Sequence, residues 1–148
     1  QVAADPSSPV NGDIVYETNT NKFRCYENSA WVDCVSGSNN PSPAYTTLTD
    51  GATVTWAFTA PQLVGNATVT LGGNRTLSIT GITSGASGVL KVVQDGGGSR
   101  TLALPASSKV INGGGGVCTL STAAAAIDIL TFTYDGTNLF WTCGNNYN

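Results

Sequence analysis

Residues that could act as catalytic bases or nucleophile partners are scarce in this chain, which contains no histidine. Histidine is the commonest general base and the usual activator of a serine nucleophile. A serine–lysine arrangement is conceivable at Ser107, Ser108 and Lys109, but a loop lysine beside small residues is the simpler interpretation. Nucleophilic catalysis is therefore not expected.

Paired carboxylates could hydrolyse a glycosidic bond, so the acidic residues are the next candidates. Most of them lie at expected turns, where an aspartate accepts hydrogen bonds from its own backbone. Asp128 is the exception, because it lies inside an apolar segment, and we expect it to pair with Arg75 or Arg100 or to cap a β-bulge. The nine acids are Asp5, Asp13, Glu17, Glu27, Asp33, Asp50, Asp95, Asp128 and Asp135. The sequence predicts that the protein is not an enzyme.

Four cysteines are present, and three pairings of them are possible. We favour Cys25–Cys34 and Cys118–Cys143, because each pair falls within one expected structural unit, and free buried thiols are the alternative. Zinc is not expected, since there is neither a Cys-x-x-Cys motif nor a histidine. The acids also lack the spacing of a dedicated calcium loop, so no metal or cofactor is predicted.

Aromatic side chains could bind sugars or a neighbouring molecule, although packing in a core or an interface is the simpler interpretation. Trp56 alternates with other apolar residues and is expected to be buried. The candidates for surface contact are Tyr26, Trp31, Tyr45, Phe140, Trp141 and Tyr147.

Charge is sparse: 10% of the 148 residues are charged, against about 25% in a typical domain. The net charge of −3 and the absence of a basic patch argue against nucleic-acid binding. No apolar run approaches the roughly 20 residues that span a bilayer, so membrane insertion is not expected. A surface of Thr, Ser, Asn and Gly loses little side-chain entropy when ordered, which suits packing against copies of the same chain.

Residues 1–12 read as an extended arm that holds Val2 and Val10 and cannot form a core alone. Two alternatives stay open for this arm: it lies along its own domain, or it pairs with the sheet edge of a neighbouring subunit. Residues 13–35 are predicted to form a small β-meander clipped by Cys25–Cys34. Residues 36–45 contain Pro41 and Pro43 and are predicted to be a linker.

Residues 46–148 are predicted to form the main domain, an all-β antiparallel sandwich or jelly roll made of many short strands. The segment from Thr53 to Phe58 alternates apolar and threonine side chains, as a half-buried strand does. The apolar phase shifts near Ile129, which predicts a β-bulge there. Asp135-Gly136 between two apolar runs predicts a hairpin.

The chain resembles a module common near the ends of bacteriophage fibre and appendage proteins. The similarity rests on the segment Gly72 to Leu77, on Leu90 to Leu102, and on Ala126 to Thr137, within about residues 50–148. The segment Pro9 to Val32 resembles a second short module, which is found in phage and bacterial surface proteins. The resemblance implies a non-catalytic β-sandwich in which Arg100 and Asp128 are fold residues.

These features predict an extracellular structural subunit that self-assembles into a fibril through β-rich contacts and an exchanged N-terminal arm. The alternative is a bacteriophage fibre or capsid-decoration protein on the virion surface that binds a cell-surface glycan. The expected partners are thus copies of the chain itself, or glycan.

Overall fold

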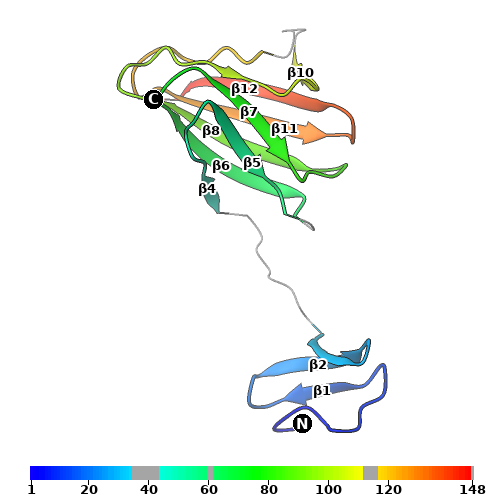
Figure 1. The fold of residues 1–148 in the computed structure, drawn as a ribbon. Helices are drawn as coiled ribbons and strands as arrows, with labels where there is room; N and C mark the ends of the chain where they lie inside the picture. The colour runs from blue at the N-terminus through cyan, green and yellow to red at the C-terminus, as the bar shows by residue number, and fades with distance from the viewer. Residues whose placement is uncertain (35–43, 60–61, 112–116, 148) are drawn as a thin grey trace. The chain divides into compact units, whose positions relative to one another are not determined.

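A computed structural model describes residues 1–34, 44–59, 62–111 and 117–147. The chain divides into two compact units, Gln1–Pro41 (unit 1) and Ser42–Asn148 (unit 2). Both units are built from strands, and no α-helix occurs in the described ranges, so the expected all-β class is confirmed (Figure 1). Consequently, those ranges hold no helix long and apolar enough to cross a membrane.

Unit 1 is a three-stranded antiparallel meander, as the sequence predicts. Its strands are β1 (Ile14–Glu17), β2 (Lys22–Glu27) and β3 (Ala30–Asp33), in that order across the sheet. Val32 lies beside Cys25 in the β2–β3 register, and the expected Cys25–Cys34 disulfide joins the end of β3 to β2. The disulfide closes a meander that is too small to be stable by strand pairing alone.

The N-terminal arm lies along its own meander, which is the first of the two alternatives left open by the sequence. The amide of Val2 donates to the Tyr16 carbonyl at 3.0 Å, and the Val2 carbonyl accepts from the amide of Thr18 at 2.9 Å. Further along the arm, the Pro6 carbonyl accepts a hydrogen bond from Trp31 Nε1 at 3.2 Å. The same contacts could be made between two copies, so exchange of the arm stays a prediction.

Unit 2 contains two sheets. The six-stranded sheet has the order β10-β12-β11-β8-β6-β4, and the three-stranded sheet has the order β5-β7-β9. The strands are β4 (Tyr45–Thr47), β5 (Thr53–Ala57), β6 (Val64–Leu71), β7 (Arg75–Thr80), β8 (Ser87–Gln94), β9 (Leu102–Ala103), β10 (Ser108–Val110), β11 (Ile127–Tyr134) and β12 (Leu139–Tyr147). Tyr45, which the sequence assigns to the linker, is thus the first residue of a strand.

From β4 to β9 the chain passes alternately between the two sheets and winds as a parallel coil. Val64 of β6 lies beside Ser87 of β8, and Thr53 of β5 lies beside Thr76 of β7; both pairs are 23 residues apart. All four strand pairs within the coil, β4–β6, β6–β8, β5–β7 and β7–β9, are parallel. The expectation of an antiparallel domain is therefore wrong for this half of unit 2.

The antiparallel part of unit 2 is the hairpin that closes the coil. β11 pairs antiparallel with β8 on one side and with β12 on the other, while β10 pairs parallel with β12. The β11–β12 turn forms at Asp135-Gly136 as predicted, with Asp135 Oδ1 accepting from the amides of Thr137 and Asn138. The register of β11 against β12 shifts between Ile127 and Ile129, which confirms the predicted bulge.

The two sheets of unit 2 lie one over the other (Figure 1), and their buried side chains form one hydrophobic core. Trp56, expected to be buried, is 3% exposed and packs edge-on against Phe132, with ring centroids 5.5 Å apart. Its neighbours in the core come from strands of both sheets: Val54, Leu77, Leu102, Val69, Leu90, Leu130 and Trp141. Alternate residues of the expected Thr53–Phe58 strand point into this core, as the sequence pattern requires.

Two paired glycines make room for the aromatic part of this core. Gly65 and Gly88 lie side by side on β6 and β8, and a Cβ on Gly88 would come within 2.6 Å of both Phe132 and Trp56. Packing of this density does not accept an added methyl group without strain.

We expect Gly88→Ala to lower the free energy of unfolding by about 1–3 kcal/mol through overpacking. Gly96→Ala is the matched control, because a Cβ on Gly96 has no atom within 4 Å. Urea unfolding of the two variants checks this expectation. Equal stability of both variants would show that the aromatic cluster moves aside freely.

Candidate functional site

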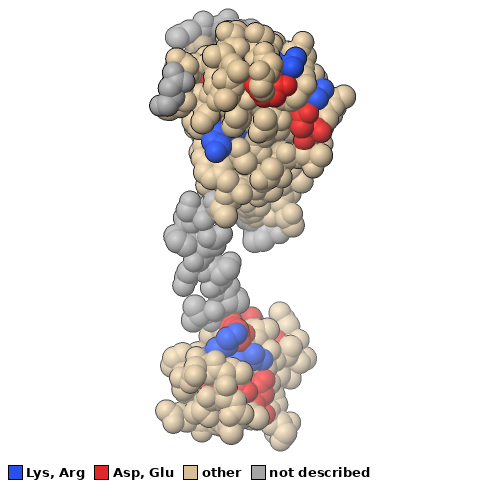
Figure 2. Space-filling model, turned by 90° about the vertical axis from the view of Figure 1, so that its left-hand side faces the viewer, with Lys and Arg blue, Asp and Glu red and all other residues tan. Residues whose placement is uncertain are grey.

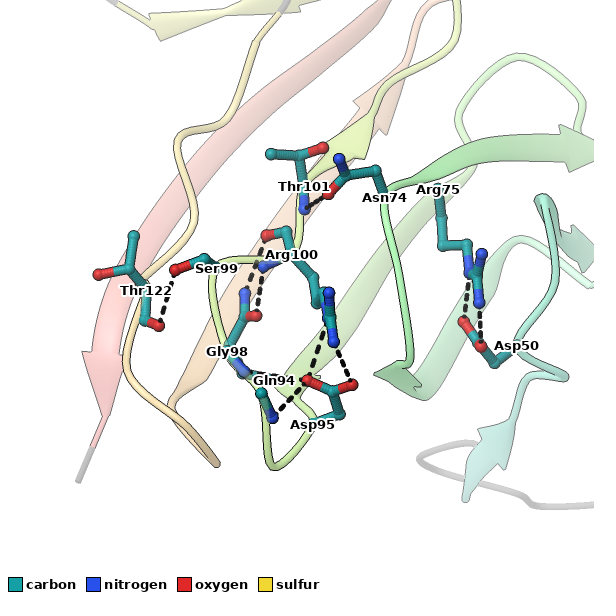
Figure 3. Close-up of polar contacts among 11 residues, drawn as sticks. Asp50, Asn74, Arg75, Gln94, Asp95, Gly98, Ser99, Arg100, Thr101 and Thr122 are labelled. Carbon is teal, nitrogen blue, oxygen red and sulfur yellow. Dashed lines mark hydrogen bonds and ion pairs between the residues drawn. The ribbon is translucent and has the colours of Figure 1, made fainter.

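Four of the eight charged side chains of unit 2, Asp50, Arg75, Asp95 and Arg100, form ion pairs at the corner of the coil (Figure 3). Arg75, at the start of β7, donates two hydrogen bonds to Asp50, from Nε at 2.8 Å and from Nη2 at 2.7 Å. Asp50 lies in the first coil, which contains β4 and β5, and Arg75 lies in the second coil, which contains β6 and β7. This bidentate pair therefore links consecutive coils. Arginine and carboxylate geometries match in such a pair.

The next corner repeats the arrangement within a single coil. Arg100 donates to Asp95 from Nε at 3.1 Å and from Nη2 at 2.9 Å. Asp95 Oδ1 also accepts from the amides of Gly97 and Gly98, at 2.9 and 3.0 Å. The buried Gln94 side chain bonds both backbone groups of Arg100, accepting from its amide at 2.7 Å and donating to its carbonyl at 3.0 Å.

The carboxylates of Asp50 and Asp95 stay ionised in the folded protein and are poorly suited to donate a proton. Hydrogen bonds from Arg75 lower the pKa of Asp50, and those from Arg100, followed by the amides of Gly97 and Gly98, lower the pKa of Asp95. A general acid needs a raised pKa, and the oxygens of both carboxylates are already occupied by donors. The corner therefore has the properties of a structural clamp.

The lowered pKa values predict a specific loss of stability in acid. A carboxylate whose pKa is depressed on folding stabilises the folded state above its unfolded pKa, and the contribution disappears as the pH falls through the folded value. We expect the unfolding midpoint in urea to be nearly flat from pH 7 to about pH 5 and to fall below about pH 4. The unfolding midpoint of the double variant Arg75→Gln/Arg100→Gln should fall less on acidification, relative to its own midpoint at neutral pH. If the unfolding midpoints of the wild-type protein and the double variant fall in parallel with pH, the two arginine–carboxylate pairs are not the cause of the acid sensitivity.

Asp128, the acid that the sequence singled out, is completely buried on β11 and does not pair with an arginine. Its Oδ1 accepts from Ser121 Oγ at 2.6 Å and from the amide of Asn146 at 3.0 Å, and its Oδ2 accepts from the amide of Ser121 at 2.8 Å. Asn146 lies on β12 beside the bulge. The expected ion pair with Arg75 or Arg100 is wrong, and the alternative of a bulge cap is confirmed.

Both cysteine pairings favoured by the sequence are present, Cys25–Cys34 and Cys118–Cys143. The second disulfide connects the segment before β11 to β12, and Cys118 is almost fully buried. Structural disulfides persist in oxidising compartments, so the pair of them points to an extracellular environment.

The aromatic candidates separate into buried and exposed residues. Trp141 is only 2% exposed and donates from Nε1 to Ser108 Oγ at 3.0 Å, so its assignment to a contact surface is wrong. Tyr45, Phe140 and Tyr147 are 51%, 47% and 54% exposed. Trp141 and Phe140 are neighbours on β12, where successive side chains point to opposite faces. Sequence alternation alone does not reveal which of the two faces the core.

In unit 1, Tyr26 and Trp31 are half-buried and lie against each other, with ring centroids 5.4 Å apart. They share the sheet face that the N-terminal arm covers, where Arg24 Nη2 also contacts Asp5 at 3.1 Å. Val2 is partly buried by its strand-like pairing, whereas Val10 is 67% exposed. The arm thus fills the contact surface that the sequence offered to a neighbour.

The opposite face of unit 1, which the sequence analysis missed, is apolar and uncovered. Ile14 is 65% exposed and Phe23 is 56% exposed. Tyr16 lies beside Phe23 with ring centroids 5.1 Å apart, and Ile14 and Val32 flank Cys25 in the neighbouring row of the same face. We call Ile14, Tyr16, Phe23 and Val32 the meander face. The alternation of apolar residues in 14–16 and 23–25 was the available signal.

The second missed surface is the open end of the coil, formed by β4 and β5. β4 ends the six-stranded sheet and β5 ends the three-stranded sheet, so in the described ranges neither strand has a partner on its outer edge. Every residue of β4 is exposed, and a recess of about 280 Å³ lies next to it, lined in part by Thr47, Thr55 and Trp56. Neither strand contains a charged residue or a proline.

A groove of about 560 Å³ crosses the outer face of the six-stranded sheet. Its lining combines the exposed Phe140, Val64 and Ile111 with the hydroxyls of Thr131 and Thr133. Lys109 contributes the only positive charge among its lining residues. The groove has the mixed apolar and hydroxyl character of a shallow binding site, and no Asp or Glu is among the residues that line it.

Most of the surface seen in Figure 2 is uncharged, and acidic and basic atoms adjoin one another at several of the places where they occur. The described residues contain no group of three or more His, Cys, Asp or Glu that could hold a metal ion. A search of protein-family models and of curated protein sequences finds no match to this chain.

Proposed function

We propose that the protein is a non-catalytic structural subunit that self-associates outside the cell, as part of a fibril or fibre. The observation that carries this proposal is the open end of the coil. Soluble proteins protect an edge strand with charge, proline, a bulge or a covering segment, because an unprotected edge pairs with other chains. β4 and β5 carry neither charge nor proline, and half of their residues are threonine.

A subunit of an extended assembly needs two contact surfaces, and the meander face supplies the second. Unit 1 is about the size at which isolated domains need disulfides, metals or association for stability. Its arm covers one side of the sheet, and Ile14 and Phe23 stay exposed on the other. The meander face of a second copy is the occupant we propose, since its four residues are uncharged; Glu27, at the end of β2, is the only charged residue of β1 to β3 on that side of the sheet.

Negative-stain microscopy and sedimentation velocity of the full chain test this proposal. We expect filaments or concentration-dependent oligomers for the wild-type protein. The double variant Ile14→Ser/Phe23→Ser should shorten filaments to small oligomers, whereas Phe140→Ser, on the outer face of unit 2, should leave them intact. A wild-type chain that stays monomeric at all concentrations would refute self-association.

Glycan binding at a virion or cell surface is the second candidate, and the groove at Phe140 favours it. An aromatic ring beside several threonine hydroxyls offers both an apolar platform and hydrogen-bonding groups. Glycan-array binding that is lost in Phe140→Ala and retained in Tyr45→Ala would support this function. Absence of binding to every glycan on the array would remove it.

A further inference from the structure

Hydrogen bonds between the β5 and β7 segments fix the directions in which the backbone N–H and C=O groups of β5 point. On β5, the Ala52 carbonyl accepts from the amide of Thr76 at 3.1 Å, and the amide of Phe58 donates to the Thr80 carbonyl at 2.8 Å. Backbone groups of alternate residues face the same side of a strand. The even-numbered residues of this segment therefore face β7, and the N–H and C=O groups of Thr53, Thr55 and Ala57 face outward.

Among the residues that the structure describes, the opposite end of the coil offers no matching edge. There the three-stranded sheet ends in β9, which has two residues and is followed within two positions by Pro105. The six-stranded sheet ends in β10, which has three residues and includes Lys109. A five-residue edge such as β5 cannot be fully paired by either strand, so head-to-tail stacking of coils is disfavoured.

The open end is, by contrast, complementary to itself. If two β5 strands pair antiparallel around Thr55, then Thr55 opposes Thr55, Thr53 opposes Ala57 and Val54 opposes Trp56. The apolar residues stay on the core side and the threonines stay on the solvent side, as register in a half-buried sheet requires. No charged side chain enters the contact, so identical edges meet without repulsion.

We propose that the first coil, residues 45–57, pairs with the first coil of a second copy about a two-fold axis, β5 antiparallel to β5 and β4 antiparallel to β4. Each sheet of unit 2 then continues into the corresponding sheet of the other copy. Such an isologous contact closes on itself and gives a dimer. The inference rests on the proposed function and names the partner at one of its two surfaces.

The test uses the full chain with Thr55→Pro and Thr55→Lys. Proline at residue 55 removes an outward N–H and leaves the β5–β7 hydrogen bonds intact, and lysine adds charge to the edge. Thr133→Lys is the matched control, since Thr133 is an exposed threonine on β11, a strand paired on both sides. Thermal unfolding of each variant verifies that it is folded, and the lysine variant serves if the proline variant is not.

To isolate this contact, all variants are made in the Ile14→Ser/Phe23→Ser background, in which the proposed contact of unit 1 is removed. We expect a reversible dimer in this background, with a dissociation constant raised at least tenfold by either Thr55 substitution and unchanged by Thr133→Lys. A nitroxide attached at Thr55→Cys should show dipolar broadening that depends on dimer formation, and one at Thr133→Cys should not.

Three results would overturn the pairing. Dimers that persist in a folded Thr55 variant place the contact elsewhere, and dimers without broadening at residue 55 exclude the two-fold register; self-association itself survives both results. If the Ile14→Ser/Phe23→Ser protein is monomeric although the wild-type chain assembles, the coil-end contact is refuted and the rest of the proposed function stands. A wild-type chain that never associates refutes the proposed function as well.

Discussion

Asp128→Ala is expected to lower the free energy of unfolding by about 3 kcal/mol or more, one of the largest losses that a single substitution in unit 2 should cause. The carboxylate accepts three hydrogen bonds, two from Ser121 and one from Asn146. Removing it leaves two amides and a hydroxyl without their acceptor, at a site where the Asp128 side chain is fully buried. Chemical unfolding of the variant measures the loss.

Ser121→Ala is the matched comparison, because it removes one of the three hydrogen bonds and leaves the carboxylate in place. We expect it to cost about 1 kcal/mol. Asp128→Asn should fall between the two, since it keeps one acceptor oxygen but replaces the other with a donor that faces donors. If Asp128→Ala is no more destabilising than Ser121→Ala, then the carboxylate does not hold the bulge and the preceding segment together.

Removal of the Cys25–Cys34 disulfide is expected to unfold unit 1 and leave unit 2 folded. The disulfide closes a loop with a sequence separation of 9 residues and contributes about 2–3 kcal/mol in the chain-entropy description. None of the residues 1–34 is fully buried, so unit 1 has little hydrophobic stabilisation to replace that contribution. The double variant Cys25→Ser/Cys34→Ser should lose protection from hydrogen exchange throughout residues 14–33.

The equivalent change in unit 2 is the control. Cys118→Ser/Cys143→Ser removes a bond with a sequence separation of 25 residues, whose expected contribution is slightly larger, about 3 kcal/mol. Unit 2 nevertheless has a core of many fully buried side chains and should stay folded with a lower unfolding midpoint. Retained exchange protection in unit 1 after loss of Cys25–Cys34 would show that the arm and Trp31 suffice to hold the meander.

The two disulfide variants should also differ in assembly, because only one of the two disulfides is needed to keep a proposed contact surface folded. An unfolded unit 1 has no meander face, so the Cys25→Ser/Cys34→Ser protein should form the dimer of coil ends and nothing longer. The Cys118→Ser/Cys143→Ser protein keeps both surfaces and should still form filaments. Microscopy of the two proteins separates the roles of the units.

The parallel coil could have been found in the sequence from one signal. The tripeptide Arg-Thr-Leu occurs at residues 75–77 and again at 100–102, each time after a glycine-rich corner. The last residue of the second copy, Leu102, is the first residue of β9 and lies beside Arg75, the first residue of the first copy, in β7. The four extra residues at the second corner, relative to the 23-residue spacing, obscure the repeat, and the buried Gln94 amide bonds to Arg100 at that corner.

The amino-acid sequence alone predicts the features that depend on neighbouring residues. Alternation from Thr53 to Phe58 predicted a half-buried strand, Asp135-Gly136 predicted a hairpin, and the positions of the four cysteines favoured the two disulfides that form. Each of these follows from the preference of a short segment for one local geometry, or from two residues within one small unit.

Which strands lie together and which faces stay open depends on the three-dimensional fold. Alternating apolar residues fit a parallel neighbour as well as an antiparallel one, so β5 could not be assigned to β7 from its own pattern. The burial of Trp141, the exposure of Phe140 and the hydrogen bonds of Asp128 depend on segments up to 33 residues away. The physical reason is that strand pairing and core packing are non-local, and their energies arise between segments whose separate sequences do not encode their meeting.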